Sequence, residues 1–127
     1  MDNNKITIDN LKDLLLKSWC AETAVGKWIA EVPSMNQCAV TALVVQDLFG
    51  GNLLRCNMTD GDSHYWNKIA DGTEIDLTEE QFNHIDGKPL RETVVIRQRD
   101  YVLSYPNTMY RYGLLLQKIA ITISEGE

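Results

Sequence analysis

The sequence has little of what metal and disulfide sites require. It holds only two histidines, His64 and His84, and three cysteines, Cys20, Cys38 and Cys56. The cysteine count is odd and no C-x-x-C pair occurs, which argues against a disulfide framework and against a zinc ribbon. Two scattered histidines are too few for a metal site, so we expect no metal ion and no other cofactor.

Positive charge and long apolar runs are also scarce. The formal net charge is -6, and no basic stripe is present that could neutralise the phosphates of a nucleic acid or an anionic membrane. No apolar run approaches the roughly 20 residues that a membrane span needs. Residues 1–5 lack the basic-then-apolar layout of a signal peptide. We therefore expect a cytoplasmic protein that binds neither nucleic acid nor membrane.

The composition that remains is that of a globular domain. Of the 127 residues, 44% are hydrophobic and 24% are charged, which suffices for one core. We expect residues 1–127 to form a single α+β domain. Its N-terminal helices, including a buried central helix, should pack on a small antiparallel β-meander.

The central helix is the stretch around which the chain is organised. Ser34 with Gln37 fits a capping box, and Asn36 is an alternative N-cap. Only three of residues 38–49 are polar, which predicts a helix buried on most sides. Gly50-Gly51 supplies the residue with positive φ that ends such a helix.

Apolar periodicity predicts the other elements. Helices are expected over 6–19 and from 106 onward, short helical turns within 20–32 and 100–104, and strands over 52–58, 63–69, 73–77 and 92–97. Asp9 or Asn10 should cap the first helix, and Thr78 with Gln81 fits a capping box after the third strand. The last helix should bury a stripe at 3-and-4 spacing, namely Met109, Tyr112, Leu116, Ile119 and Ile123.

The loop between the second and third strands has two possible lengths with opposite consequences. If the loop is Asp71-Gly72 alone, Asp76 shares a face with Asn67, and His64 points to the other face. If the loop is the three residues 70–72, Asp76 is the diagonal neighbour of His64 on one face, about 7–8 Å away between backbones. Glycine in the last place suits both loops.

Cys38, His64 and Asp76 have the residue types and the chain order of a catalytic triad. A cysteine at a helix start is easily made a thiolate, because free N–H groups and the helix dipole favour the anion. His64 would take the thiol proton and Asp76 would orient the imidazole, which requires the three-residue loop. Gln37 and the Cys38 backbone N–H are candidates to bind an oxyanion, and Trp66 is a candidate cleft wall.

Four segments resemble the YunG family of small bacterial proteins: residues 36–51, 60–67, 72–78 and 111–115. The four segments are spread over residues 36–115, and the resemblance implies no particular activity. More loosely, the Cys–His–Asp order is similar to the core of transglutaminase-like proteins and arylamine N-acetyltransferases, within the papain-like group. That resemblance implies a papain-like core, with a nucleophile at Cys38, a base at His64 and an orienting group at Asp76.

Two functions of different classes follow from these residues. The first is a cysteine hydrolase or acyltransferase acting on an amide, peptide or thioester, with a small molecule or peptide as substrate. The second is a non-catalytic binding domain in which Cys38 is a small core residue, His64 a hydrogen-bonded sheet residue, and Asp76 a helix cap or a solvated side chain. Cys20 is a weaker candidate for cysteine chemistry because it lacks a capped helix start, and Cys56 is expected in the core.

Overall fold

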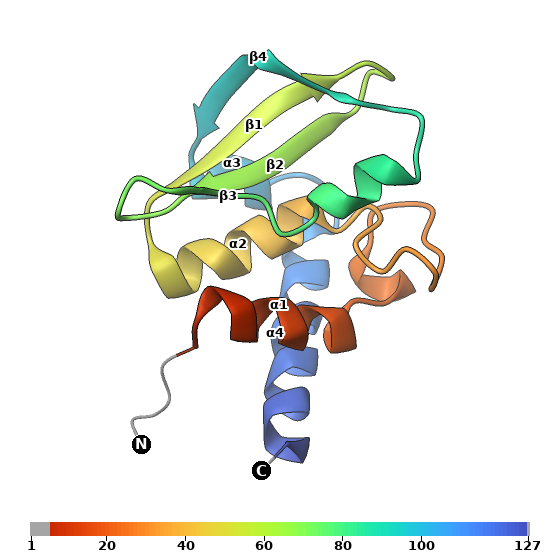
Figure 1. The fold of residues 1–127 in the computed structure, drawn as a ribbon, viewed down its shortest axis with the longest axis vertical. Helices are drawn as coiled ribbons and strands as arrows, with labels where there is room; N and C mark the ends of the chain where they lie inside the picture. Colours follow the sequence, from red (N-terminus) through yellow and green to blue (C-terminus); the bar gives the residue numbers. More distant parts are fainter. Residues whose placement is uncertain (1–5, 127) are drawn as a thin grey trace.

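Figure 1 shows the computed structural model, which describes residues 6–126 of the chain. The fold is α+β, as predicted, with a four-stranded antiparallel sheet in the order β3-β2-β1-β4. The strands are β1 (Asn52–Met58), β2 (Ser63–Lys68), β3 (Glu74–Ile75) and β4 (Pro89–Arg97). The helices are α1 (Ile8–Ser18), α2 (Cys38–Phe49), α3 (Arg99–Leu103) and α4 (Thr108–Glu125), with short 3-10 helices η2 (Ala21–Thr23) and η3 (Glu79–Asn83).

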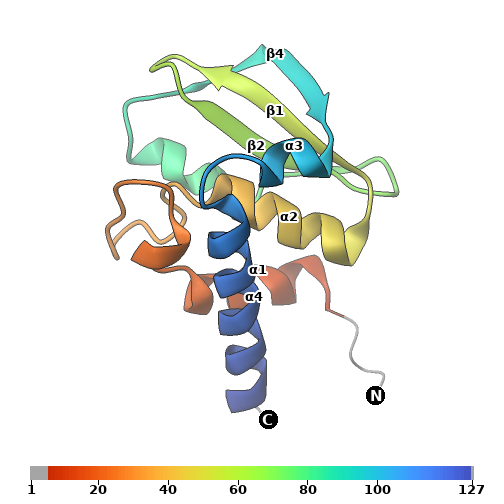
Figure 2. The same cartoon turned by 180° about the vertical axis from the view of Figure 1, so that it is seen from behind.

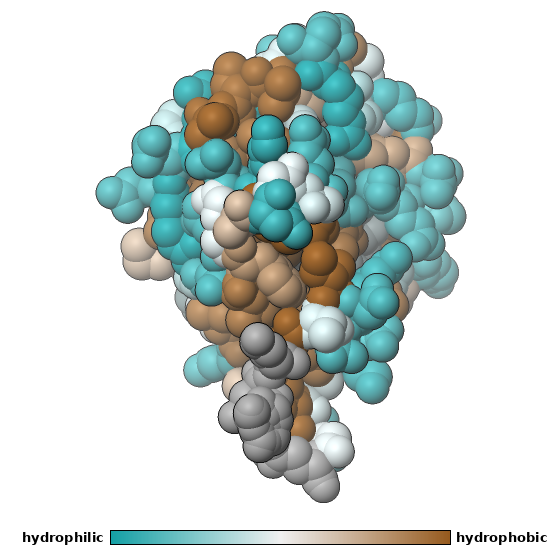
Figure 3. Space-filling model, turned by 60° about the vertical axis from the view of Figure 1, so that its left-hand side comes forward, coloured by the Kyte–Doolittle hydropathy of each residue, from teal (hydrophilic) through white to brown (hydrophobic). Residues whose placement is uncertain are grey.

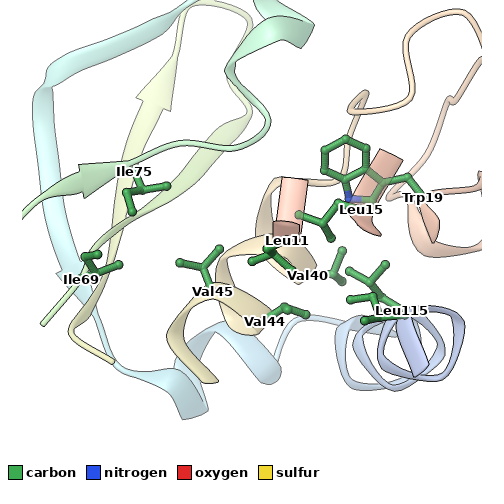
Figure 4. Close-up of a cluster of buried hydrophobic side chains, with 10 residues drawn as sticks. Leu11, Leu15, Trp19, Val40, Val44, Val45, Ile69, Ile75 and Leu115 are labelled. Atoms are coloured by element: carbon green, nitrogen blue, oxygen red, sulfur yellow. The ribbon is translucent and has the colours of Figure 1, made fainter. Parts of the chain in front are cut away.

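Helix α2 lies between the sheet and the pair α1 and α4, so that both of its sides are covered (Figures 1 and 2). Its residues from Val40 to Val45 are all buried, which confirms the predicted burial on most sides. The main core joins α1, α2, α4 and the β2–β3 hairpin (Figure 4). Its buried members are Leu11, Leu15, Trp19, Val40, Val44, Val45, Ile69, Ile75, Leu115 and Ile119.

The turn from α2 into β1 depends on glycine, as predicted. Gly50 and Gly51 have φ of 70° and 84°, a region that residues with a side chain rarely adopt. A Cβ on Gly51 would also lie 2.1 Å from the carbonyl oxygen of Lys68. The chain can therefore reverse tightly at this point and run back along the helix as β1.

The caps of the first two helices differ from the prediction. Thr7, and not Asp9 or Asn10, caps α1, since its hydroxyl accepts the N–H of Asn10 at 3.0 Å. At α2 the N-cap is Gln37, and no side chain caps the helix. The predicted Ser34–Gln37 capping box is wrong because the Gln37 carboxamide bonds to other groups.

The helix predicted after the third strand is the 3-10 helix η3, without a capping box. The Thr78 hydroxyl does not cap this helix; it accepts from the Gln81 side chain at 3.2 Å instead. The carboxamide oxygen of Gln81 also accepts the backbone N–H of Asn36 at 3.1 Å. Gln81 thus connects η3 to the loop that precedes α2.

Helix α4 packs on a stripe that matches the predicted one only in part. Met109, Leu116 and Ile123 are 64%, 39% and 38% exposed. The buried positions are Thr108, Arg111, Leu115 and Ile119. Of the predicted residues, Ile119 is therefore buried, and Tyr112 is partly buried against the core. Three consecutive leucines, 114–116, fit either phase, so apolar spacing alone does not choose between them. Across residues 6–126, neither this helix nor any other has the length and apolar character that crossing a membrane would take.

Candidate active site

The β2–β3 hairpin has the three-residue loop and brings Asp76 to His64. Asn67 pairs with Ile75, and the N–H of Ile69 donates to the carbonyl of Thr73 across the loop. Gly72, the last loop residue, has φ of 92°. This register makes Asp76 the diagonal neighbour of His64, and the imidazole Nε2 donates to Asp76 Oδ2 at 2.6 Å.

Asp76 is held in place from both sides of its carboxylate. Oδ1 accepts the backbone N–H of Thr78 at 3.2 Å and the Thr78 hydroxyl at 3.4 Å, the pattern of an Asx turn. Oδ2, which faces His64, also accepts from Nη2 of Arg91 at 3.3 Å. The Asp76 carboxylate is therefore held in position, and Arg91 balances its negative charge in addition to the imidazole.

The imidazole of His64 is fully buried between two aromatic rings. Trp66 stacks on it with ring centroids 5.5 Å apart, and Phe82 meets it edge-on at 4.6 Å. Trp66 is itself only 4% exposed, and its indole N–H donates to Glu74 at 2.9 Å. Trp66 therefore supports the imidazole and does not line an open cleft, which corrects that expectation.

Cys38 is the first residue of α2 and is partly exposed. The second imidazole nitrogen of His64, Nδ1, is buried and has no hydrogen-bond partner. Burial lowers the pKa of His64, but the hydrogen bond to Asp76 and the interaction with Cys38 raise it by more, from 6.5 to about 9. Because Nε2 is occupied by Asp76, Nδ1 is the nitrogen that remains for the thiol.

The side chain of Gln37 does not face a cleft. It is fully buried, with its oxygen accepting from the Thr23 hydroxyl at 2.9 Å and its nitrogen donating to the Cys20 carbonyl at 2.9 Å. This corrects the assignment of Gln37 to an oxyanion site. In the part of the chain that the structure describes, the backbone N–H of Cys38 has no acceptor, as expected at an uncapped helix start.

Cys20 and His84 lie apart from this arrangement, whereas Cys56 is a buried neighbour of His64. Cys56 is fully buried opposite His64 on β1, and burial raises the pKa of its thiol. Cys20 precedes η2, and His84 is exposed after η3. Among residues 6–126, no three His, Cys, Asp or Glu side chains are grouped so that they could hold a metal ion.

Sequence reasoning missed three of the residues that shape this site. The sequence predicts Thr78 only as part of a capping box, and it does not assign Phe82 or Arg91 to the site. The Asp-x-Thr spacing of an Asx turn is a signal that could have identified Thr78. Phe82 and Arg91 arrive from η3 and β4, and no local pattern marks them.

Comparison with known proteins places the chain in a family. The family model described as "YunG protein" matches residues 7–124. The chain belongs to the YunG family. A YunG relative from Bacillus subtilis (strain 168), "Uncharacterized protein YunG", is 41% identical over 75 residues. The match covers 59% of this chain and 63% of that protein, less than two thirds of its length.

No solved structure matches this YunG chain. The YunG resemblance expected from the sequence is confirmed by the family model, whereas the expected likeness to papain-like and transglutaminase-like cores is not shown. The chemistry of this chain is therefore inferred from the side chains around Cys38 and not from a structural relative.

Proposed function

We propose that the protein is a cysteine-dependent hydrolase or acyltransferase that uses Cys38, His64 and Asp76 on an amide, peptide or thioester. The observation that carries the proposal is the state of the His64 ring. Its Nε2 is held by Asp76 at 2.6 Å, while its Nδ1 is buried, unpartnered and free to serve the Cys38 thiol. A base oriented in this way is what a thiol nucleophile needs.

The first half of the reaction is acylation. With a pKa of about 9, His64 is protonated at neutral pH and can form an ion pair with a Cys38 thiolate. The sulfur attacks the acyl carbon, and the bond from that carbon to the leaving group breaks. The leaving amine, alcohol or thiol takes the proton from Nδ1, and the developing oxyanion lies near the free N–H of Cys38.

The second half regenerates the thiolate. Neutral His64 takes a proton from water, or from an acceptor amine, as its oxygen or nitrogen attacks the thioester carbon. The carbon–sulfur bond breaks, the acyl group leaves as an acid or an amide, and the Cys38–His64 ion pair is restored. Asp76 stabilises the imidazolium throughout, and Arg91 pairs with Asp76. A helix that begins at the cysteine and antiparallel strands that carry His and Asp also suit a papain-like core, which we propose as the fold relationship.

Alkylation of Cys38 by iodoacetamide tests this proposal. At about pH 6 an ordinary free thiol is almost fully protonated, so fast alkylation of Cys38 in the native fold indicates an activated sulfur. His64→Ala should slow the reaction roughly 100-fold, the lower range for loss of an acid–base group. His84→Ala, which removes an exposed imidazole, should leave the rate unchanged. An inert Cys38 in the folded wild type would refute the proposal.

A second candidate is a non-catalytic binding domain. It is favoured by β4, an edge strand on which Val94, Val95 and Ile96 are 44%, 41% and 56% exposed. Figure 3 shows an apolar patch at the end of the molecule where the sheet lies, and a second apolar area lower on the same face. Exposed apolar edge strands are used to add a partner strand. If binding is the function, Cys38→Ser should preserve the biological readout and charged residues at Val94 and Ile96 should abolish it.

A further inference from the structure

Arg111 is a buried cation without an acidic partner. It is 7% exposed, and its Nη2 donates to the Thr108 hydroxyl at 3.0 Å. Among residues 6–126, no carboxylate forms an ion pair with it. A guanidinium has five N–H donors, and a buried charge without a counter-charge is costly to maintain. Its remaining guanidinium N–H groups, which have no acceptor in the described part of the chain and are not among the fully buried unpaired groups there, are therefore available to bind an anion.

The position of Arg111 associates this charge with Cys38. Arg111 lies in the first turn of α4, which begins beside the start of α2 in both views (Figures 1 and 2). Burial lowers the pKa of Arg111, and the charged groups that counteract this are first Cys38 and then Tyr105. The guanidinium thus lies close enough to Cys38 for the two groups to interact electrostatically.

The charges around Cys38 balance without Arg111. Asp76 is compensated by Arg91, and a thiolate at Cys38 is compensated by the imidazolium of His64. Moving the proton from His64 back to Cys38 leaves the sum unchanged. In either state the positive charge of Arg111 has no counter-charge among the described residues. Arg111 is therefore suited to bind an anionic ligand and is not needed as the partner of the thiolate.

We propose that Arg111 is a specificity-determining residue, and that the acyl substrate bears a carboxylate which its free guanidinium N–H groups bind beside Cys38. The planar fork of donors matches the two oxygens of a carboxylate. The substrate class is then an amide or thioester that carries a free carboxylate near the acyl carbon. This inference rests on the proposed function, because it takes Cys38 as the nucleophile.

Charged and neutral alkylating reagents of matched shape test the proposal. Cys38 is alkylated with iodoacetate and 3-iodopropionate, each compared with its own amide, at about pH 7 where both acids are ionised. In the wild type at least one acid should be favoured over its amide. Arg111→Met should lower that acid-to-amide rate ratio about tenfold, the lower end of a charge-assisted hydrogen bond.

Two further variants separate charge from folding. Arg111→Lys keeps the charge and should retain part of the preference for the acid. Arg99→Met removes an arginine that pairs with Asp47 at the other end of α2, and should leave the ratio unchanged. If Arg111→Met slows acid and amide by the same factor, Arg111 has only a structural role and the inference is overturned. If neither the acids nor their amides alkylate folded wild-type Cys38, the proposed function fails and the inference fails with it.

Discussion

The two ends of α2 differ in what their side chains do. Toward its C-terminal half, Val44 and Val45 are buried against α1, α4 and the β2–β3 hairpin in a cluster of apolar side chains (Figure 4). At its start, Gln37, Cys38 and Thr41 meet polar groups; the Thr41 hydroxyl, for example, accepts from the Trp19 indole at 2.9 Å. One helix thus combines a stabilising half with a half built around an imidazole and a thiol.

The difference follows from helix geometry. The first turn of a helix presents N–H groups that have no partner within the helix, whereas its middle has every backbone group bonded. An apolar surround suits the middle, and an anion or a polar group suits the start. If this division holds, substitutions at the two ends should separate loss of stability from loss of Cys38 reactivity.

The largest effect on stability is expected from Leu115→Ala. Leu115 is fully buried in the main core, and such a truncation costs about 2–5 kcal/mol of unfolding free energy. Leu116→Ala is the matched control, because its side chain is 39% exposed and its loss should cost less than about 1 kcal/mol. Urea unfolding measures both. Alkylation of Cys38 in the folded fraction should be unchanged in both variants; equal costs would contradict the observed stripe of α4.

The next effect is a fall in stability with rising pH. Folding raises the pKa of His64 from 6.5 to about 9, so the folded protein binds this proton more tightly than the unfolded chain. The contribution is fully present below pH 6.5 and is lost as the pH rises through 9, at most roughly 3 kcal/mol. His64→Gln should flatten this part of the urea-midpoint profile, and His84→Gln should not. A wild-type profile without the decline would contradict the ion-paired imidazole.

A third prediction concerns Asp76→Asn. The hydrogen bond from His64 to Asp76 is the largest of the interactions that raise the pKa of the imidazole. The variant should therefore move that pKa back toward 6.5, as followed by NMR of the imidazole across a pH titration. Glu74→Gln is the control, since Glu74 bonds to Trp66 on the same hairpin without touching His64. Equal shifts in the two variants would mean that Asp76 acts only on the fold.

Much of this organisation could be predicted from local patterns. Alternation gave β1 with its observed bounds, and burial of α2 followed from its few polar residues. The length of the hairpin loop could not be predicted, because Asp-Gly suits two loop lengths. Only the pairing of Ile69 with Thr73 decides between them. That pairing is what carries Asp76 to His64.

What local patterns could not predict are contacts between distant segments. Gln37 fits a capping box in the sequence, but Thr23 and the Cys20 carbonyl, from the preceding loop, bind its carboxamide instead. The buried stripe of α4 includes Arg111, which an apolar stripe excludes by definition. The polar residues of the site were the hardest to predict, because their partners come from elements far along the chain.

The smallest effect is expected from Cys38→Ala. The interaction of Cys38 with His64 helps to raise the imidazole pKa, so the variant should move that pKa back toward 6.5. Its unfolding free energy should change by less than about 1 kcal/mol, since the partly exposed residue leaves no large cavity. Cys56→Ala is the control at a fully buried cysteine, and should cost more stability while leaving Cys38 alkylation intact. A Cys38→Ala protein that is strongly destabilised, with an unchanged imidazole pKa, would assign Cys38 to the core and erase the distinction between the two ends of α2.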